Sequence, residues 1–300
     1  VIQSGADAGK GNNFGIVPLV SMKKYEEKKA LYKTDELRKM QCIVFDVNAS
    51  NDDYEQTAEK VKSAEESLKT IKEDELPYFV SQESDPEYPY VSSYLAEKDI
   101  DYAFRVFAFT AKKDSVAPTM LDGASFKTAK VLSNVVTRPD SVKVKMLGFR
   151  GITASATVDS LMKVLKSGES FDALLTKYPN GAMDLGWVRE GQVGLDTIDN
   201  VIFTSKAGEI SKIENDGVVF LTKVEEVRNM VKKVRLAVIS NKVVPSGETY
   251  RNIFEKANSF IAKNNTKEKF VAAAEAENLQ LRELGPMTEN QSNLYVVENA

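Results

Sequence analysis

Apolar and polar positions along the chain alternate in blocks that predict short strands, each followed by helices. Met40–Val47 is a short apolar run rich in strand formers. Ser50, with Asp53 three residues later, matches a capping box at the start of a helix. The apolar residues after it recur at near-helical spacing: Tyr54, Ala58, Val61 and Leu68. A strand followed by a helix is the prediction.

The same order returns in the middle of the chain. Val142–Phe149 reads as a strand, and the next apolar positions follow a helical i, i+3, i+4, i+7 spacing: Val158, Leu161, Met162 and Leu165. Gly168 ends that helix, and Ser170 caps a shorter one that runs to about Tyr178. A further helical stretch over Asp196–Phe203 precedes a hairpin that closes on Val218–Val227.

A third strand and helix pattern begins at Val234 and has no visible closing hairpin before Ala300. Ser246 caps a helix with one apolar stripe: Ile253, Phe254, Ala257, Phe260 and Ile261. Thr266 caps another helix, which runs to about Glu277. Strands, helices and hairpins in this order favour an α+β fold, with small antiparallel sheets and helices packed on them.

Two landmarks recur at one spacing. Phe109-Thr110-Ala111-Lys112 returns as Phe203-Thr204-Ser205-Lys206, and Asp122-Gly123 returns as Asp216-Gly217. The offset, from 109 to 203 and from 122 to 216, is 94 residues in both cases. A period this long favours tandem domains over a solenoid.

Composition narrows the function classes. With 300 residues, 42% apolar and 28% charged, the chain can form two or three ordinary domains. A net charge of −4 argues against nucleic-acid binding, which needs clustered excess Lys and Arg. The single cysteine, Cys42, and the absence of histidine predict neither a disulfide nor a metal site, and no motif predicts a cofactor.

No apolar run approaches the ~20 residues of a membrane helix. We expect both ends to be trimmed, which leaves a membrane anchor outside this sequence open.

The middle of the chain resembles a parvulin domain, the rotamase domain of periplasmic peptidyl-prolyl isomerases and chaperones of the SurA/PpiD type. The resemblance rests on separated landmarks in the order of that family: Lys166–Leu174, Asp184–Trp187, Glu190–Gln192, Val201–Phe203, Gly208–Ser211 and Val219–Val224. It implies an N-terminal linker and helix over 1–39, a diverged parvulin-like domain over 40–138 and a second over 139–231. A truncated strand-helix-helix unit then occupies 232–300.

The family implies two facing histidines on adjacent strands, and the matching positions here are Met146 and Val219. The loop of the family's cysteine or aspartate is shortened, and Val193 and Ile198 replace Met and Phe in the pocket wall. Catalytic residues are therefore predicted to be absent. The resemblance implies a peptide-binding groove lined by Met146, Trp187, Val193, Ile198, Phe203 and Val219.

Structural roles for these residues stay open. Met146 and Val219 lie on predicted strands, where apolar side chains are most often core. Trp187 suits either a groove aromatic or a residue packed on its own sheet. Asp184, beside a Leu-Gly pair, suits a turn cap better than an acid.

Three functions remain open. The first is a non-catalytic periplasmic chaperone, tethered to the inner membrane, that binds unfolded envelope proteins. The second is a prolyl isomerase with residual activity, and the third is a scaffold within an envelope complex. The lost histidines favour the first.

Overall fold

The computed structural model describes residues 26–27 and 38–287. The chain forms two units, one of residues 48–249 and one that combines the described residues up to Val47 with those from Tyr250 onward. Most of the predicted N-terminal linker and helix, residues 1–39, lies outside the described residues, as does the end of the chain from residue 288.

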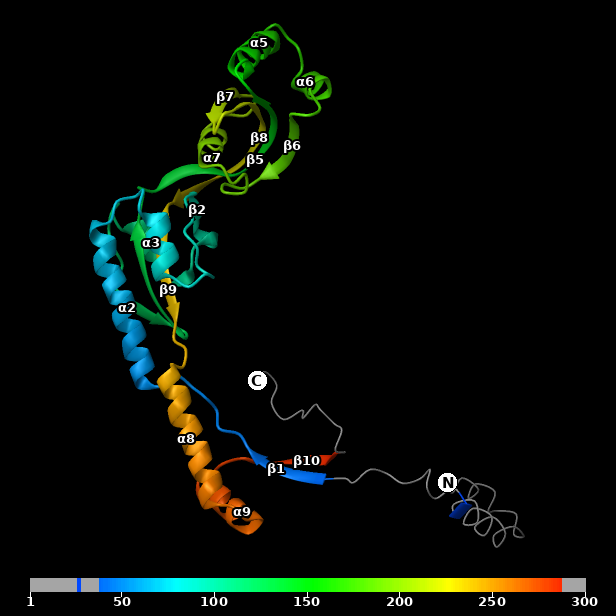
Figure 1. The fold of residues 1–300 in the computed structure, drawn as a ribbon. Helices are drawn as coiled ribbons and strands as arrows, with labels where there is room; N and C mark the ends of the chain where they lie inside the picture. Colours follow the sequence, from blue (N-terminus) through cyan, green and yellow to red (C-terminus); the bar gives the residue numbers. More distant parts are fainter. Residues whose placement is uncertain (1–25, 28–37, 288–300) are drawn as a thin grey trace, which may run out of the picture. The chain divides into compact units, whose positions relative to one another are not determined.

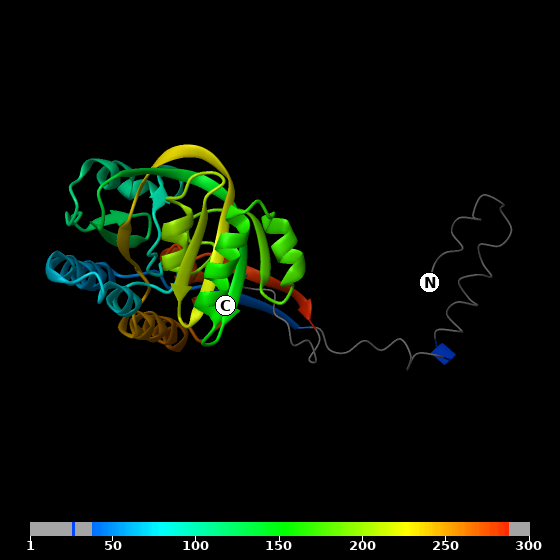
Figure 2. The same cartoon turned by 90° about the horizontal axis from the view of Figure 1, so that it is seen from above.

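A five-stranded antiparallel sheet forms one part of the larger unit (Figure 1). Its four main strands lie in the order β6-β5-β8-β7, and the short β2 pairs with the far end of β8. The strands are β2 (Leu95–Ala96), β5 (Val136–Arg150), β6 (Ala182–Val188), β7 (Ile210–Asn215) and β8 (Val218–Val234). The two longest, β5 and β8, bend along their length (Figure 2), and their register shifts between Lys143 and Val144. Such a bulge bends a strand and increases its twist.

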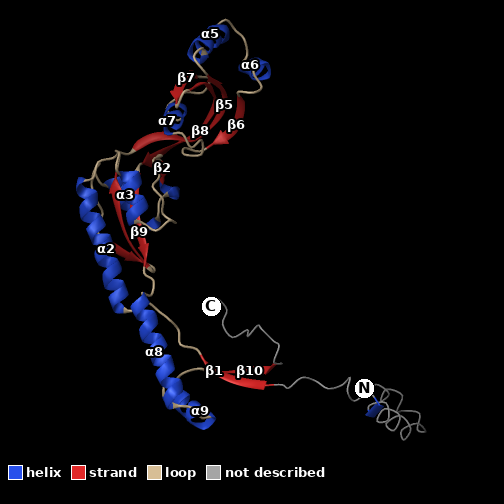
Figure 3. Ribbon diagram, viewed as in Figure 1, coloured by secondary structure: helices blue, strands red, loops and turns tan. Residues whose placement is uncertain are grey.

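Helices cover both faces of this sheet (Figure 3). On one face lie α5 (Ala154–Lys166) and α6 (Phe171–Lys177), and on the other lies α7 (Asp196–Ile202). The predicted signals are confirmed: α5 ends before Gly168, which has a φ of +107°, and the Ser170 hydroxyl accepts from the Ala173 N–H at 3.0 Å. A left-handed glycine ends a helix without steric cost.

A second sheet, of three strands in the order β3-β4-β9, completes the larger unit. Two helices, α2 (Asn51–Thr70) and α3 (Leu76–Glu83), pack on one face through Leu68 and Val80. The other face buries Phe104 and Ala108. The remaining elements are β3 (Met120–Asp122), β4 (Ser125–Val131), β9 (Leu236–Lys242), α4 (Arg105–Thr110) and the 3₁₀ turns η3 (Glu97–Asp99) and η4 (Tyr102–Phe104).

The four main strands of the five-stranded sheet, β5 to β8, are inserted into the three-stranded one, whereas β2 precedes it in the sequence. β4 and β9 are antiparallel neighbours, with Val131 opposite Leu236, although more than a hundred residues separate them in the sequence. The inserted chain leaves after β4 and returns at β9. Because pairing between β4 and β9 depends on these distant residues, no local pattern could reveal it.

The repeated landmarks correspond to a helix end followed by a hairpin. Phe109 lies at the end of α4, and Phe203 directly follows α7. Asp216 and Gly217 form the turn of the β7–β8 hairpin, whereas Asp122 ends β3 and the β3–β4 turn consists of Gly123 and Ala124. Asp216 and Gly217 have φ values of +46° and +74°, as such turns require. The likeness between the two hairpins extends no further. The next neighbour of β8 is β5, which precedes its hairpin in the sequence, whereas the next neighbour of β4 is β9, which follows its hairpin.

The smaller unit corrects two of the expected boundaries. The strand expected over 40–47 is observed as β1 (Arg38–Ile43), and it pairs with β10 (Leu281–Met287) rather than with a sheet of residues 48–138. Conversely, β9 belongs to the larger unit and not to a unit of residues 232–300. The helices α8 (Gly247–Lys263) and α9 (Lys267–Ala276) form as predicted. Rings of Phe45 and Phe270 pack edge-on against Phe260, with centroids 6.0 and 5.6 Å away.

The predicted fold class is confirmed, since helices pack on antiparallel sheets in an α+β arrangement. Within the described residues, no helix combines the length and apolar character needed to cross a bilayer.

Candidate functional site

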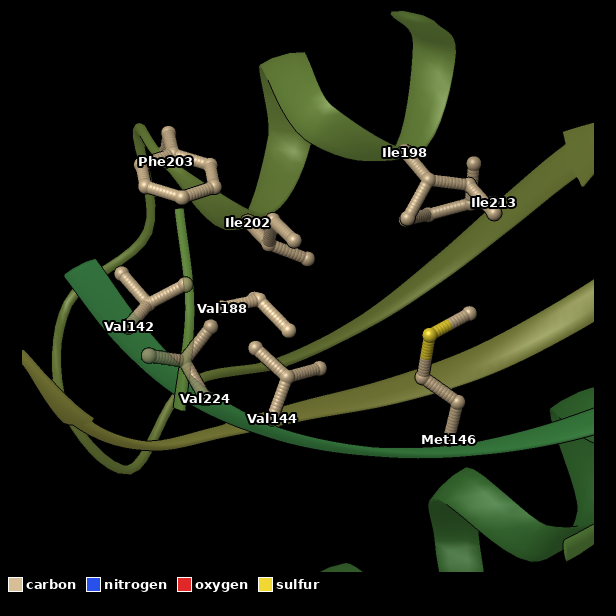
Figure 4. Close-up of a cluster of buried hydrophobic side chains, with 9 residues drawn as sticks. All are labelled: Val142, Val144, Met146, Val188, Ile198, Ile202, Phe203, Ile213 and Val224. Atoms are coloured by element: carbon tan, nitrogen blue, oxygen red, sulfur yellow. The ribbon is translucent and has the colours of Figure 1, made fainter. Parts of the chain in front are cut away.

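The face of the five-stranded sheet under α7 holds a tightly packed apolar cluster (Figure 4). Alternate residues of β5 point toward α7, which contributes Ile198 and Ile202 from successive turns. Nine buried residues form the cluster: Val142, Val144, Met146, Val188, Ile198, Ile202, Phe203, Ile213 and Val224.

Three residues of the predicted groove meet inside this cluster and fill it. Met146, Ile198 and Phe203 are each no more than 2% exposed, and Val193 packs against them from the side. The structure thus places these side chains together as core. A groove between them is not open, because their side chains are in contact with one another.

Val219 lies on the opposite face of the sheet. It packs with residues of α5 and α6, alongside Leu147 and Leu221. In the observed register Met146 stands opposite Thr222, Gly148 opposite Phe220, and Phe149 opposite Val219. Side chains alternate between faces, so the apolar β8 residues on the face of Met146 are Phe220 and Val224, one on each side of Thr222.

Sequence reasoning missed Phe220 because residues 218–221 are all apolar and give no alternation to follow. A usable signal lies further along the strand. Val224 is core under α7, and counting back by twos from it reaches Thr222 and then Phe220.

Trp187 lies outside the cluster. Its ring is half-buried on β6, and the guanidinium of Arg228 lies over it, 3.8 Å from the ring centroid. This cation–π contact occupies one face of the indole. Asp184 accepts from the Gly186 N–H at 3.1 Å, so it has the predicted role of a turn cap.

An open cavity of about 690 Å³ adjoins the filled cluster. It lies where the end of β5 and the start of β8 meet the loop of residues 178–181, between α6 and β6. Met183 and Phe220 line the cavity and also pack against the cluster. Aromatic rings of Phe149 and Tyr178, packed edge-on with centroids 5.4 Å apart, form another part of the wall.

Two glycines shape the cavity. The Gly148 N–H donates to the Gly181 carbonyl at 2.9 Å, which fixes the loop against β5. A Cβ on Gly181 would lie 2.4 Å from the Gly148 carbonyl oxygen, and one on Gly148 would lie 3.3 Å from the Phe220 ring. Glycine at both positions therefore permits the close approach of loop, strand and ring.

Residues 126–228 match the sequence model of the PPIC-type PPIASE domain. Residues 126–228 are therefore similar to a parvulin domain of this type, and we refer to them as the parvulin-like segment. The match covers the segment from β4 through most of β8, and therefore the whole sheet face and cavity described above.

Two solved structures are similar to the chain. PrsA from Bacillus subtilis is 16% identical, with a TM-score of 0.26, over 46% of this chain and 48% of that one. The peptidylprolyl isomerase PrsA from Bacillus anthracis is also 16% identical, with a TM-score of 0.24, over 48% of this chain and 62% of that one. The chain thus spans about half to three fifths of these proteins. No curated protein matches it.

The parvulin-like segment offers little acid–base chemistry at its cavity. None of the described residues that line it is His, Cys, Asp or Glu, and the chain contains no histidine at all. Its polar lining consists of the cations Arg150 and Lys177, the Asn180 amide and the Tyr178 hydroxyl. No group of three or more residues able to hold a metal occurs among those described. Such a cavity can bind apolar side chains and peptide carbonyls.

Proposed function

We propose that the chain is a parvulin-type chaperone that has lost the catalytic histidines and binds unfolded polypeptide segments. The observation that carries the proposal is the face of the parvulin sheet under α7. Met146 is core there, Phe220 lies on the same side of the neighbouring strand, and the chain has no histidine.

The cavity beside that face supports peptide binding without catalysis. Rotation about an X-Pro bond has a barrier of ~18–20 kcal/mol, and each ~1.4 kcal/mol removed accelerates it tenfold. Binding an unfolded polypeptide segment does not require lowering that barrier. It requires only an apolar surface and backbone hydrogen bonds. Phe149, Tyr178, Met183 and Phe220 supply the apolar surface. In the described sheet β6 is an edge strand, paired on one side with β5, and can accept an added strand.

Binding of an unfolded polypeptide by aromatic variants tests the proposal. Phe220→Ala removes a ring that lines the cavity, so we expect it to weaken binding of a fluorescently labelled, urea-unfolded outer-membrane protein segment by about three- to tenfold. Fluorescence anisotropy of the full chain measures this directly.

Tyr102→Ala is the matched control, since Tyr102 is an exposed aromatic of the same unit that does not line the cavity. Equal affinities of the two variants, or no binding by the unmodified chain, would remove the proposal. A scaffold role predicts that outcome.

A residual prolyl isomerase is the second candidate, favoured by the match to a PPIC-type domain. The variant that tests it is again Phe220→Ala. Phe203 is 1% exposed core, so its truncation would destabilise the domain by about 3–5 kcal/mol and confuse the readout.

The proposed setting is the periplasm of a Gram-negative cell, with a tether to the inner membrane outside the described residues and unfolded envelope proteins as partners. Its support is the resemblance to the SurA/PpiD type. Fractionation of cells that express the whole protein tests it: recovery from the cytoplasm would contradict this setting.

A further inference from the structure

A second cavity, of about 280 Å³, lies in the larger unit beside α7 and near the start of β5. It is separate from the cavity at Phe220 and has a different character, because five charged residues line it: Arg138, Glu190, Asp196, Asp199 and Arg235. Pockets for drug-sized ligands begin at about 300 Å³, so this one suits a small group.

Asp199 is the unusual member of the lining. It is 3% exposed, and among the described residues the Gly191 N–H is the one backbone donor that acts on its carboxylate, without reaching good hydrogen-bond geometry with either oxygen. Burial raises the pKa of Asp199 to about 6, and the nearby Glu190 and Asp196 raise it too, while the Gly191 N–H and Lys233 act in the opposite direction. Buried carboxylates normally have partners, and an orphan one facing a cavity indicates a missing donor.

The other two carboxylates of the lining already have donors. Glu190 accepts from Arg138 at 2.5 Å and from Lys233 at 2.9 Å, and both Glu190 and Lys233 have side chains only 3% exposed. Asp196 accepts from the Ser92 hydroxyl at 2.6 Å. Asp199 is therefore the one carboxylate of the described lining with free acceptors.

The cations of the lining are also committed. Arg138 donates to the Asn200 side chain at 2.9 Å and lies over the Tyr94 ring, 4.0 Å from its centroid. Arg235 pairs with Glu73 at 2.6 Å and donates to the Ser92 carbonyl at 2.7 Å. Neither guanidinium group donates to Asp199.

Charge decides which ligand fits. Two arginines and three carboxylates give the lining a net charge of −1, and Lys233 and Glu73, paired with lining residues, cancel one another. An anion is therefore disfavoured, and no metal-binding group of three or more ligands occurs in the described residues. We infer that this cavity binds a primary alkylammonium group, whose N–H donors pair with the free oxygens of Asp199.

Calorimetric titration of the full chain with n-butylammonium at pH 8 tests the inference. We expect saturable binding, and at least tenfold weaker binding by Asp199→Asn, because the amide removes the negative charge that attracts the cation. n-Butanol, which has the same alkyl chain without the charge, is expected not to bind. Asp159→Asn, an exposed exchange of the same type on α5, is expected to bind as the unmodified chain does.

A pH series provides a second readout that needs no variant. With a pKa of about 6, Asp199 is mostly protonated at pH 5, so binding there should be about tenfold weaker than at pH 8. Absence of saturable binding at pH 8, or equal affinity for Asp199→Asn, would show that the cavity holds water alone and would overturn the inference.

The ammonium group could belong to a free amine or to a lysine side chain of a polypeptide. Titration with spermidine and with N-acetyl-lysine amide distinguishes these sources, and tight binding of either supports the ammonium site. Because n-butylammonium is not a polypeptide, the result is independent of the chaperone proposal.

Discussion

Two glycines determine how the loop of residues 178–181 meets the parvulin sheet. Neither Gly148 nor Gly181 has a positive φ, so backbone conformation is not what requires glycine there. The requirement is space, since a Cβ on Gly181 would lie 2.4 Å from the Gly148 carbonyl oxygen. Real Cβ atoms do not approach backbone oxygens so closely, and the loop would have to move.

Gly181→Ala is expected to lower the free energy of unfolding by about 1–3 kcal/mol, as for overpacked sites. The midpoint of urea unfolding measures the change. Gly247→Ala is the control, because a Cβ there would meet no atom within 4 Å. An unchanged midpoint for Gly181→Ala would contradict the geometry of the loop.

The resemblance to parvulins predicted that Met146, Ile198 and Phe203 share a site, but it could not predict that the site is filled. Whether facing apolar side chains enclose a groove or touch depends on sub-ångström distances between β5 and α7. The side of the sheet on which Val219 and Phe220 lie depends on the register between β5 and β8. An all-apolar run does not specify that register.

At the scale of elements, Asp53 joins the start of α2 to residues 246–249. Its carboxylate accepts from the backbone N–H groups of Ser50 at 2.8 Å and Ser246 at 3.2 Å, and from the Thr249 hydroxyl at 2.7 Å. The bond from Ser246, followed by that from Ser50, holds the pKa of Asp53 well below its usual value of 3.8. Only the ionised form can accept all of these bonds.

Asp53→Asn is therefore expected to reduce stability at pH 7, where the ionised carboxylate contributes fully. Because the pKa is depressed in the folded state, that contribution is present above about pH 4 and is lost as the pH falls below it. Urea midpoints at pH 7 and pH 3 should show the gap between the two proteins narrowing at pH 3.

Asp52→Asn, an exposed change in the same helical turn, is expected to leave the midpoint nearly unchanged. A gap that stays constant with pH would mean that Asp53 acts through packing rather than charge.

Helices were easier to predict than strand partners for a physical reason. The caps at Ser50, Ser170 and Thr266 act within four residues, so the sequence specifies them locally, and all three are confirmed. The pairs β1–β10 and β4–β9 join segments more than a hundred residues apart, and their hydrogen bonds leave no local pattern.

At the scale of the whole molecule, most of the parvulin-like segment is an insertion between β4 and β9. The chain enters it along β5 and leaves it along β8, and β2 pairs with the last residues of β8. The 94-residue repeat reflects a shared helix and hairpin, which explains why it suggested two whole domains. The proposed function raises two questions at this scale, namely whether the inserted segment binds polypeptides and whether it isomerises them.

The proposed function is tested most directly by exchange NMR of a proline-containing peptide that is titrated with the full chain. The experiment reports binding and isomerisation together. We predict shift changes that saturate, while cis–trans exchange stays at the uncatalysed timescale of tens to hundreds of seconds. Exchange accelerated to below about a second, or no shift changes at all, would contradict the account.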